Sequence, residues 1–326
     1  MDISTIRRIG SPASGRPLPG CERTLRSLVC LAIFVAATLF APKIEAQAII
    51  APAGLTLFHR GSLVRSFTEI NRFSLSNNGN SVSGTEYVNP LAVVYGFHPN
   101  WEVIAVQPYV VTDVTTRTAG QTEHTGVNGF ADSQFFVQYD GLFSRNSPGG
   151  LTRLSGVFGV QAPTGAERFS TGAFEYTSGL IFEKAIRLKY YFTSDFEYTF
   201  ATENNQKVSV GDSARFDAVP AYMLISRQEG PVKGAGWAHN AYSRIFRNGA
   251  FLILEFNGSW QGHATSAGTE VPNSGGTGLL ISPGIQYFPS RKIILEFSVP
   301  VPAITELNGI QPKPDTSFLV GFRYLF

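Results

Sequence analysis

The sequence is poor in charged residues, almost without cysteine and without a long apolar run. Lys, Arg, Asp and Glu make up 15% of its 326 residues, whereas soluble domains carry about a quarter. The longest apolar run, 28–41, has fourteen residues, fewer than the roughly 20 that a transmembrane helix needs. Both cysteines, Cys21 and Cys30, lie near the start. These features argue against an ordinary soluble domain and against a helical membrane protein.

The N-terminal 48 residues have the order of a secretory signal peptide. Five arginines between positions 7 and 26 precede the apolar run, and Ala46-Gln47-Ala48 follows it as a small-residue cleavage site. We expect cleavage after Ala48, which leaves 49–326 as the mature chain. A single transmembrane anchor is the alternative, but the apolar run is too short for one.

Removing residues 1–48 changes the balance of charge and removes both cysteines. The segment holds six of the 26 basic and three of the 24 acidic side chains, so the formal charge falls from +2 to about −1. No basic excess is left to indicate a nucleic-acid partner. The mature chain also has no disulfide framework and must be stable by other means.

Apolar and aromatic residues recur at every second position over stretches of ten residues or more. The clearest stretch is 188–200, and similar alternation occurs in 172–183, 251–260 and 292–301. Soluble strands usually have about five or six residues, whereas about ten are needed to cross a bilayer at a tilt. A secreted β-sandwich also alternates, but its strands are shorter and its exposed faces are not aromatic. The pattern therefore predicts an all-β, transmembrane, antiparallel up-and-down β-barrel.

About twelve strands can be placed, and their connections alternate between long polar loops and brief turns. An even count puts both termini in the periplasm, with the long loops outside. The predicted strands are 62–74, 84–97, 101–113, 128–142, 151–163, 172–186, 188–201, 211–227, 250–263, 276–288, 291–303 and 315–326.

Two features do not fit a simple meander. Residues 228–249 form a long link on the periplasmic side, which either stays there or folds in and narrows the lumen. Proline also occurs inside four predicted strands, although it cannot donate to a ladder. We expect bulges or earlier strand ends there, at Pro108, Pro220, Pro283 and Pro300.

The chain ends on a strand with aromatic residues at alternate positions. Phe322, Tyr324 and Phe326 fall on the predicted lipid face, together with Phe318 and Val320. A terminal Phe preceded by alternate aromatic residues resembles the C-terminal signal that outer-membrane proteins present to the bacterial barrel-assembly machinery. The two ends of the chain therefore indicate the same compartment, the outer membrane of a Gram-negative bacterium.

The opposite face of the strands carries the charged side chains. Charge on the lipid face of a barrel is costly, whereas charge facing the lumen is solvated or paired. We therefore expect a partly acidic lumen wall, which either selects cations or forms a structural ionic network. The candidate lumen-lining residues are Glu175, Glu183, Lys189, Asp195, Glu197, Glu255, Glu296 and Arg323.

Three segments resemble a family of outer-membrane transporters associated with the meta-pathway of phenol degradation. "VVYGFHPNWEVIAVQPYV" (93–110) is similar to its strand, short turn and strand closing on Pro-Tyr. "GFADSQFFVQYDGLF" (129–143) is similar to its Gly-x-Gly-Asp strand, with Ala131 in place of the usual Gly before Asp132. The third, 156–184, has its strand ending in Pro-Thr-Gly. The resemblance implies a barrel that passes small, often aromatic, molecules.

A non-transport barrel, either structural or a phospholipase-like enzyme, is the alternative. His239, Asn240 and Ser243 lie close together in "AHNAYSR", but they lack that enzyme family's spacing. No cofactor or metal motif occurs. We expect a channel for passive passage of small solutes, with outer-membrane lipid, the assembly machinery and the solute as partners. The oligomeric state is left open.

Overall fold

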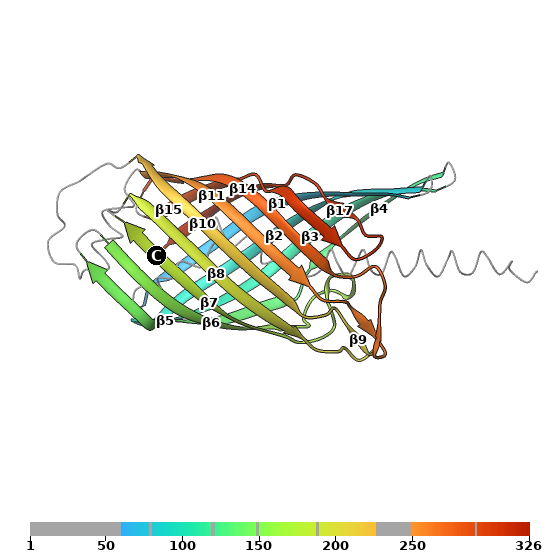
Figure 1. Cartoon of the computed structure of the whole chain (residues 1–326), viewed down its shortest axis with the longest axis horizontal. Helices are drawn as coiled ribbons and strands as arrows, with labels where there is room; N and C mark the ends of the chain where they lie inside the picture. Colours follow the sequence, from blue (N-terminus) through green and yellow to red (C-terminus); the bar gives the residue numbers. More distant parts are fainter. Residues whose placement is uncertain are drawn as a thin grey trace, which may run out of the picture.

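The computed structural model describes residues 60–77, 80–118, 121–147, 150–186, 189–225, 249–290 and 292–326. Within these residues, twelve strands close into one antiparallel barrel (Figure 1), which confirms the predicted fold and strand number. The wall consists of β1 (Ser62–Asn77), β2 (Asn80–His98), β3 (Trp101–Thr118), β5 (Ser133–Ser147), β6 (Gly150–Ala162), β7 (Glu175–Ile186), β8 (Tyr190–Ala201), β10 (Ser213–Ile225), β11 (Gly249–Gln261), β14 (Gly276–Phe288), β15 (Ile293–Ser298) and β18 (Phe318–Leu325).

Shorter elements continue these strands or connect them. β4 (Gln121–Phe130) leads into β5, β16 (Val301–Leu307) follows β15, and β17 (Lys313–Pro314) precedes β18. A three-stranded sheet outside the wall contains β9 (Val208–Ser209), β12 (Thr265–Ser266) and β13 (Thr269–Glu270). A 3-10 turn, η2 (Glu167–Phe169), lies between β6 and β7.

The barrel closes because its first and last strands pair. β1 lies antiparallel to β18 from Leu63 opposite Leu325 to Ile70 opposite Phe318. Closure leaves no long free edge, so backbone N–H and C=O groups can pair even where lipid surrounds the wall. We call the end of the barrel that holds Phe326 the proximal end and the opposite end the distal end.

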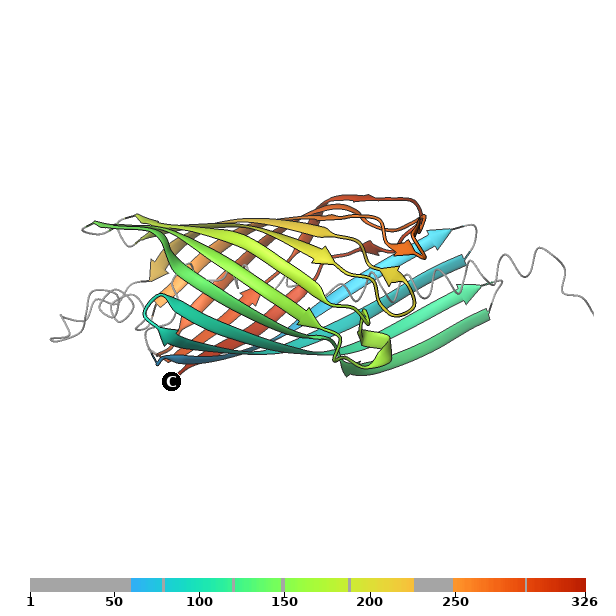
Figure 2. The ribbon, with the colours of Figure 1, turned by 90° about the horizontal axis from the view of Figure 1, so that it is seen from below.

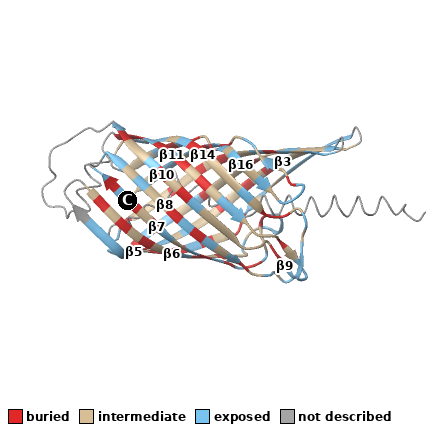
Figure 3. Cartoon of the chain, viewed as in Figure 1, coloured by how far each residue is buried: buried red, intermediate tan, exposed pale blue. Residues whose placement is uncertain are grey.

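Side chains alternate between a large apolar outer face and a buried inner face. In β18, Val320 is 58% exposed and its neighbour Leu319 only 4%. Figure 3 shows the same alternation as bands along the strands. The outward residues are those that the two-residue period of the sequence assigned to lipid. An apolar band on the outside of a barrel is stable against acyl chains and not against water.

Two hairpins extend further than the sequence predicted. The expected loop at 114–127 is mostly strand, because β3 continues to Thr118 and pairs with β4 down to Tyr109 opposite Phe130. Figures 1 and 2 show the blue and green hairpins of β1–β4 projecting beyond the distal end. Beyond the bilayer both faces of a strand meet water, so apolar alternation no longer marks it. Threonine and valine, which favour strands, mark it instead.

The four prolines that the sequence placed inside strands lie where a ladder is interrupted, which confirms that prediction. Pro300 separates β15 from β16, and Pro283 lies where β14 changes partner between them. Pro108 lies where β3 changes partner from β5 to β4. Pro220 falls in a gap in the β10–β11 register. A residue without an N–H is tolerated at each position because that edge carries no regular bond.

Some predicted features lie outside the described residues. These are the signal peptide at 1–48, most of the 228–249 link and the His239, Asn240 and Ser243 cluster. Among the helical residues that the structure does describe, none forms a helix long and apolar enough to cross a membrane.

Candidate functional site

The inner face of the barrel gathers polar and charged side chains from most strands. Seven of the eight predicted residues lie on this face. The carboxylates among them are buried, and the side chain of Arg323 is 15% exposed. The seven are Glu175, Glu183, Asp195, Glu197, Glu255, Glu296 and Arg323.

Lys189 is the exception, and its assignment to the lumen was wrong. It is exposed and lies in the turn before β8, so the alternation of that strand does not extend to it. Its Nζ lies 5.0 Å from the centroid of the Tyr222 ring. Tyr222 pairs with the exposed Tyr190 on the outer face. A hydrogen bond with Tyr222 raises the pKa of Lys189 above its ordinary value.

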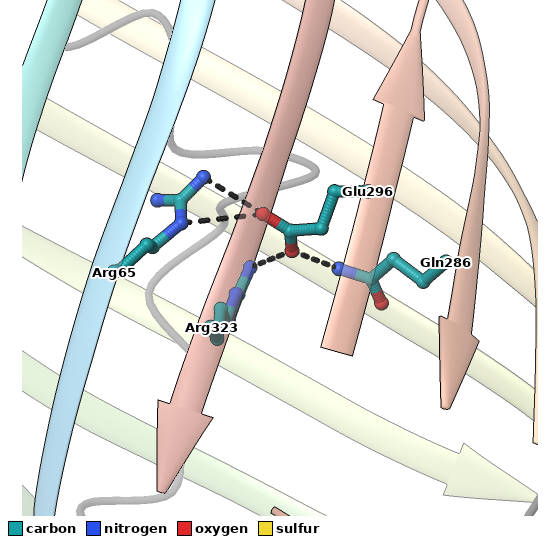
Figure 4. Close-up of polar contacts among 4 residues, drawn as sticks. All are labelled: Arg65, Gln286, Glu296 and Arg323. Atoms are coloured by element: carbon teal, nitrogen blue, oxygen red, sulfur yellow. Dashed lines mark hydrogen bonds and ion pairs between the residues drawn. The ribbon is translucent and has the colours of Figure 1, made fainter. Parts of the chain in front are cut away.

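One ionic group connects four strands near the proximal end (Figure 4). Glu296 of β15 accepts hydrogen bonds from Arg65 of β1 at 3.1 Å, from Arg323 of β18 at 2.7 Å and from Gln286 of β14 at 2.7 Å. Two guanidinium groups thus share one carboxylate. The group carries one net positive charge and ties the first strand of the barrel to the last two.

A second group has the opposite balance. Arg215 of β10 contacts three carboxylates, Asp217 at 3.0 Å, Glu197 at 3.1 Å and Asp195 at 3.6 Å. Asn257 of β11 donates to Asp217 at 2.9 Å and accepts a bond from Ser282 at 2.8 Å. The three carboxylates and one guanidinium leave a net charge of about −2 if all are ionised.

Two further polar groups lie on β5, β6 and β7, next to the strands of the Arg215 group. Arg153 of β6 binds Asp140 of β5 at 2.6 Å, and it lies opposite Glu183 in the β6–β7 register. Nearer the distal end, Gln134 donates to Gln161 at 3.0 Å, and Gln161 donates to Glu175 at 3.1 Å. Four of the predicted acidic residues are therefore members of networks that also contain arginines or amides: Glu175, Asp195, Glu197 and Glu296.

The inner face also carries apolar clusters, which the sequence reasoning missed. At the proximal end, Phe251 and Phe288 pack edge to face with centroids 5.4 Å apart, and Tyr191 packs against Phe251 at the same distance. The other buried members of this proximal apolar cluster are Phe67, Val219, Met223, Ile253 and Leu319. A smaller cluster on the other wall joins Phe136, Val157 and Ile181. The signal was present, because Phe251 and Ile253 share the period of Glu255, but the prediction for this face considered only its charged residues.

The aromatic residues at the chain end lie on the outer face. Phe322 and Phe326 are exposed, and the rings of Tyr324 and Phe326 pack edge to face at 4.8 Å. Among the described residues, no group of three or more His, Cys, Asp or Glu side chains is arranged to hold a metal ion.

Solved outer-membrane barrels resemble this fold. The COG4313 outer membrane channel from Pseudomonas putida F1 aligns with a TM-score of 0.62 and 11% identity, over 84% of this chain and 98% of its own. The translocator domain of the autotransporter NalP from Neisseria meningitidis aligns at 0.47 and 11% identity, over 90% and 99%. The CymD monoaromatic hydrocarbon channel aligns at 0.40 and 10%, over 87% and 94%. At these identities only the fold is shared.

Sequence comparison places the chain in a family. No functionally curated protein matches its sequence. The model of the family described as "Putative MetA-pathway of phenol degradation" matches residues 77–301, which cover most of the barrel. This is the family that the three sequence segments resemble. The chain belongs to it.

Proposed function

We propose that this protein is an outer-membrane channel through which small solutes pass passively along the inner face of the barrel. The observation that carries the proposal is the contrast between the two faces of one closed wall. Large apolar side chains cover the outside, and charged networks beside apolar clusters cover the inside. Such a wall is stable in lipid, and its inner face offers polar solutes a path that the hydrocarbon of the bilayer does not.

We further propose that the solutes are small and at least partly apolar, with aromatic molecules as the leading class. The proximal apolar cluster offers ring edges and faces that favour other rings. Membership of a family named for phenol degradation supports the same class. Barrels of eight strands are filled by side chains and those of sixteen leave an open channel, so twelve strands suit a narrow route.

Localisation and assembly follow from the same proposal. Export uses the signal peptide at 1–48, and the assembly machinery recognises Phe322, Tyr324 and Phe326. The distal hairpins then face the outside and both chain ends face the periplasm. The likeness of the fold to a solved outer-membrane channel supports a location in the outer membrane.

Planar-bilayer recording of the refolded mature chain tests this function. We expect stepwise conductance, and we expect phenol to enter liposomes that carry the protein faster than empty ones. A trace that stays closed, together with hydrolysis of phospholipid or ester substrates, would instead favour the enzyme alternative.

A further inference from the structure

The three segments that carry the family resemblance meet at one place at the distal end. Gln107 of β3 donates to the carbonyl oxygen of Ala131 at 2.8 Å and accepts a bond from Ser133 at 2.6 Å. The Ser133 hydroxyl also lies 2.7 Å from that of Thr164. The Pro-Tyr, Ala-Asp and Pro-Thr-Gly segments, far apart in the sequence, therefore form one hydrogen-bonded junction.

Asp132 is the centre of this junction. Its side chain is buried, with the residue 2% exposed. One carboxylate oxygen accepts the backbone N–H of Gly165 at 2.8 Å, and the other accepts the N–H of Thr171 at 3.0 Å and its hydroxyl at 3.3 Å. A carboxylate that accepts several such donors is held firmly. Asp132 thus fixes both ends of the loop 163–174, which we call the latched loop.

The latched loop lies against the inner face of the wall. Phe169, 2% exposed, packs against Val110 and Ala131, with Val88 and Val127 beside them. Val88 and Val110 share the period of buried residues, opposite the exposed Leu91 and Val103. Figure 2 shows the loop, in yellow-green, curled at the distal end. A loop whose central aromatic side chain packs on the inner face is directed toward the lumen at this end of the barrel.

Two charged side chains of the loop are left exposed. Glu167 and Arg168 immediately precede the buried Phe169 and are exposed. Gly165 permits the close approach, because a Cβ there would lie 2.8 Å from the carbonyl carbon of Ala131 and 2.9 Å from the N of Asp132. The junction therefore serves to place this loop, and with it one acidic and one basic group, at the distal mouth.

We propose that the latched loop is the size- and charge-selective constriction of the channel, held in place by Asp132. This inference rests on the proposed channel function and adds the residues that set its selectivity. Solutes entering from the distal side pass Glu167 and Arg168 first. The residues of the family motif then hold the constriction in place and do not themselves contact the solute.

Bilayer recordings on four variants test the proposal. Asp132→Ala and Gly165→Ala both free the loop, so each should raise conductance and let larger neutral sugars swell liposomes. Glu167→Gln and Arg168→Gln should shift the reversal potential in opposite directions, the first toward anions and the second toward cations. The last two changes are exposed and leave the latch intact, so they remain informative if the latch variants fail to fold.

Matched controls separate the loop from general effects. Asp212→Ala removes another carboxylate of the distal end, which accepts hydrogen bonds from Ala201 and Tyr198 and none from the latched loop. Glu306→Gln removes a charge on the outer face of β16, opposite Thr277. Neither should change conductance or reversal potential. A wild-type channel that conducts while all four test variants behave like wild type would overturn the constriction alone. A wild type that never conducts would overturn the proposed function and the constriction together.

Discussion

At the scale of single residues, the inner face is organised by a few arginines that bind carboxylates from neighbouring strands. Arg215 forms ion pairs with three carboxylates, whereas Glu296 is bound by two arginines and one side-chain amide. A buried ion pair adds little stability compared with an apolar pair of the same shape, but losing one partner leaves an uncompensated charge. The two groups should therefore respond differently to loss of an arginine.

Replacing Arg215 by Met should destabilise the barrel more than replacing Arg65 by Met. The first change leaves Asp195, Glu197 and Asp217 close together without their shared cation, at a cost of about 3–5 kcal/mol. The second leaves Glu296 with Arg323 and Gln286. Urea unfolding followed by tryptophan fluorescence and heat-modifiable gel migration measures both. Equal losses would contradict the assignment of the charges.

The last residue of the chain makes a second residue-scale prediction. Phe326 is 62% exposed on the outer face, and its neighbour Leu325 ends β18 on the other face. Phe326→Asp should reduce insertion into the outer membrane more than Leu325→Asp, because it removes the terminal aromatic of the proposed assembly signal. The amount of folded barrel in membrane fractions measures the effect. Similar amounts for both variants would remove the support for the signal.

At the scale of elements, the alternation in the sequence is enough to place the strands and their lipid faces. It does not give the strand ends or the residue-by-residue pairing between strands. Strand positions within the bilayer follow from the contrast between apolar and polar positions, and Val320 and Leu319 show it clearly. The ends of β3 and β4 lie in water, where that contrast vanishes. The partners depend on register, which the order of residues alone does not reveal. Arg65 and Glu296, for example, lie 231 positions apart in the sequence.

The orientation of the hairpins can be tested directly. An epitope inserted between β3 and β4, or at the turn between β12 and β13, should bind antibody on intact cells. One inserted at 289–290, between β14 and β15, should bind only after the outer membrane is opened. The reverse pattern would show that the proximal end faces outward.

At the scale of the whole molecule, the inner face combines a net negative group, a net positive group and apolar clusters within one wall. Rings of carboxylates favour cations in a pore, but here Arg215 partly neutralises three carboxylates and two arginines outweigh Glu296. We therefore expect the channel to have only a weak preference between cations and anions. Its inner face also offers apolar clusters to uncharged solutes. This combination suits small neutral solutes better than ions.

Neutralising Asp195 and Glu197 together should lower the preference of the channel for cations. The local charge around Arg215 would change from about −2 to about zero, with Asp217 still bound to the arginine. The reversal potential in a salt gradient measures the change. The control is Glu203→Gln with Glu270→Gln, which removes the same charge from exposed positions outside the barrel wall. If the double variant and the control give the wild-type value, the carboxylates have a structural role only.

The central claim, that solutes travel along the inner face, is tested most directly by cysteine block of the current. Residues 49–326 contain no cysteine, so Thr177→Cys on the inner face and Ser178→Cys on the outer face form a matched pair. A charged thiol reagent added during bilayer recording should reduce the conductance of Thr177→Cys and leave that of Ser178→Cys unchanged. An open channel whose current is unaffected at Thr177→Cys, or blocked equally in both variants, would contradict the account.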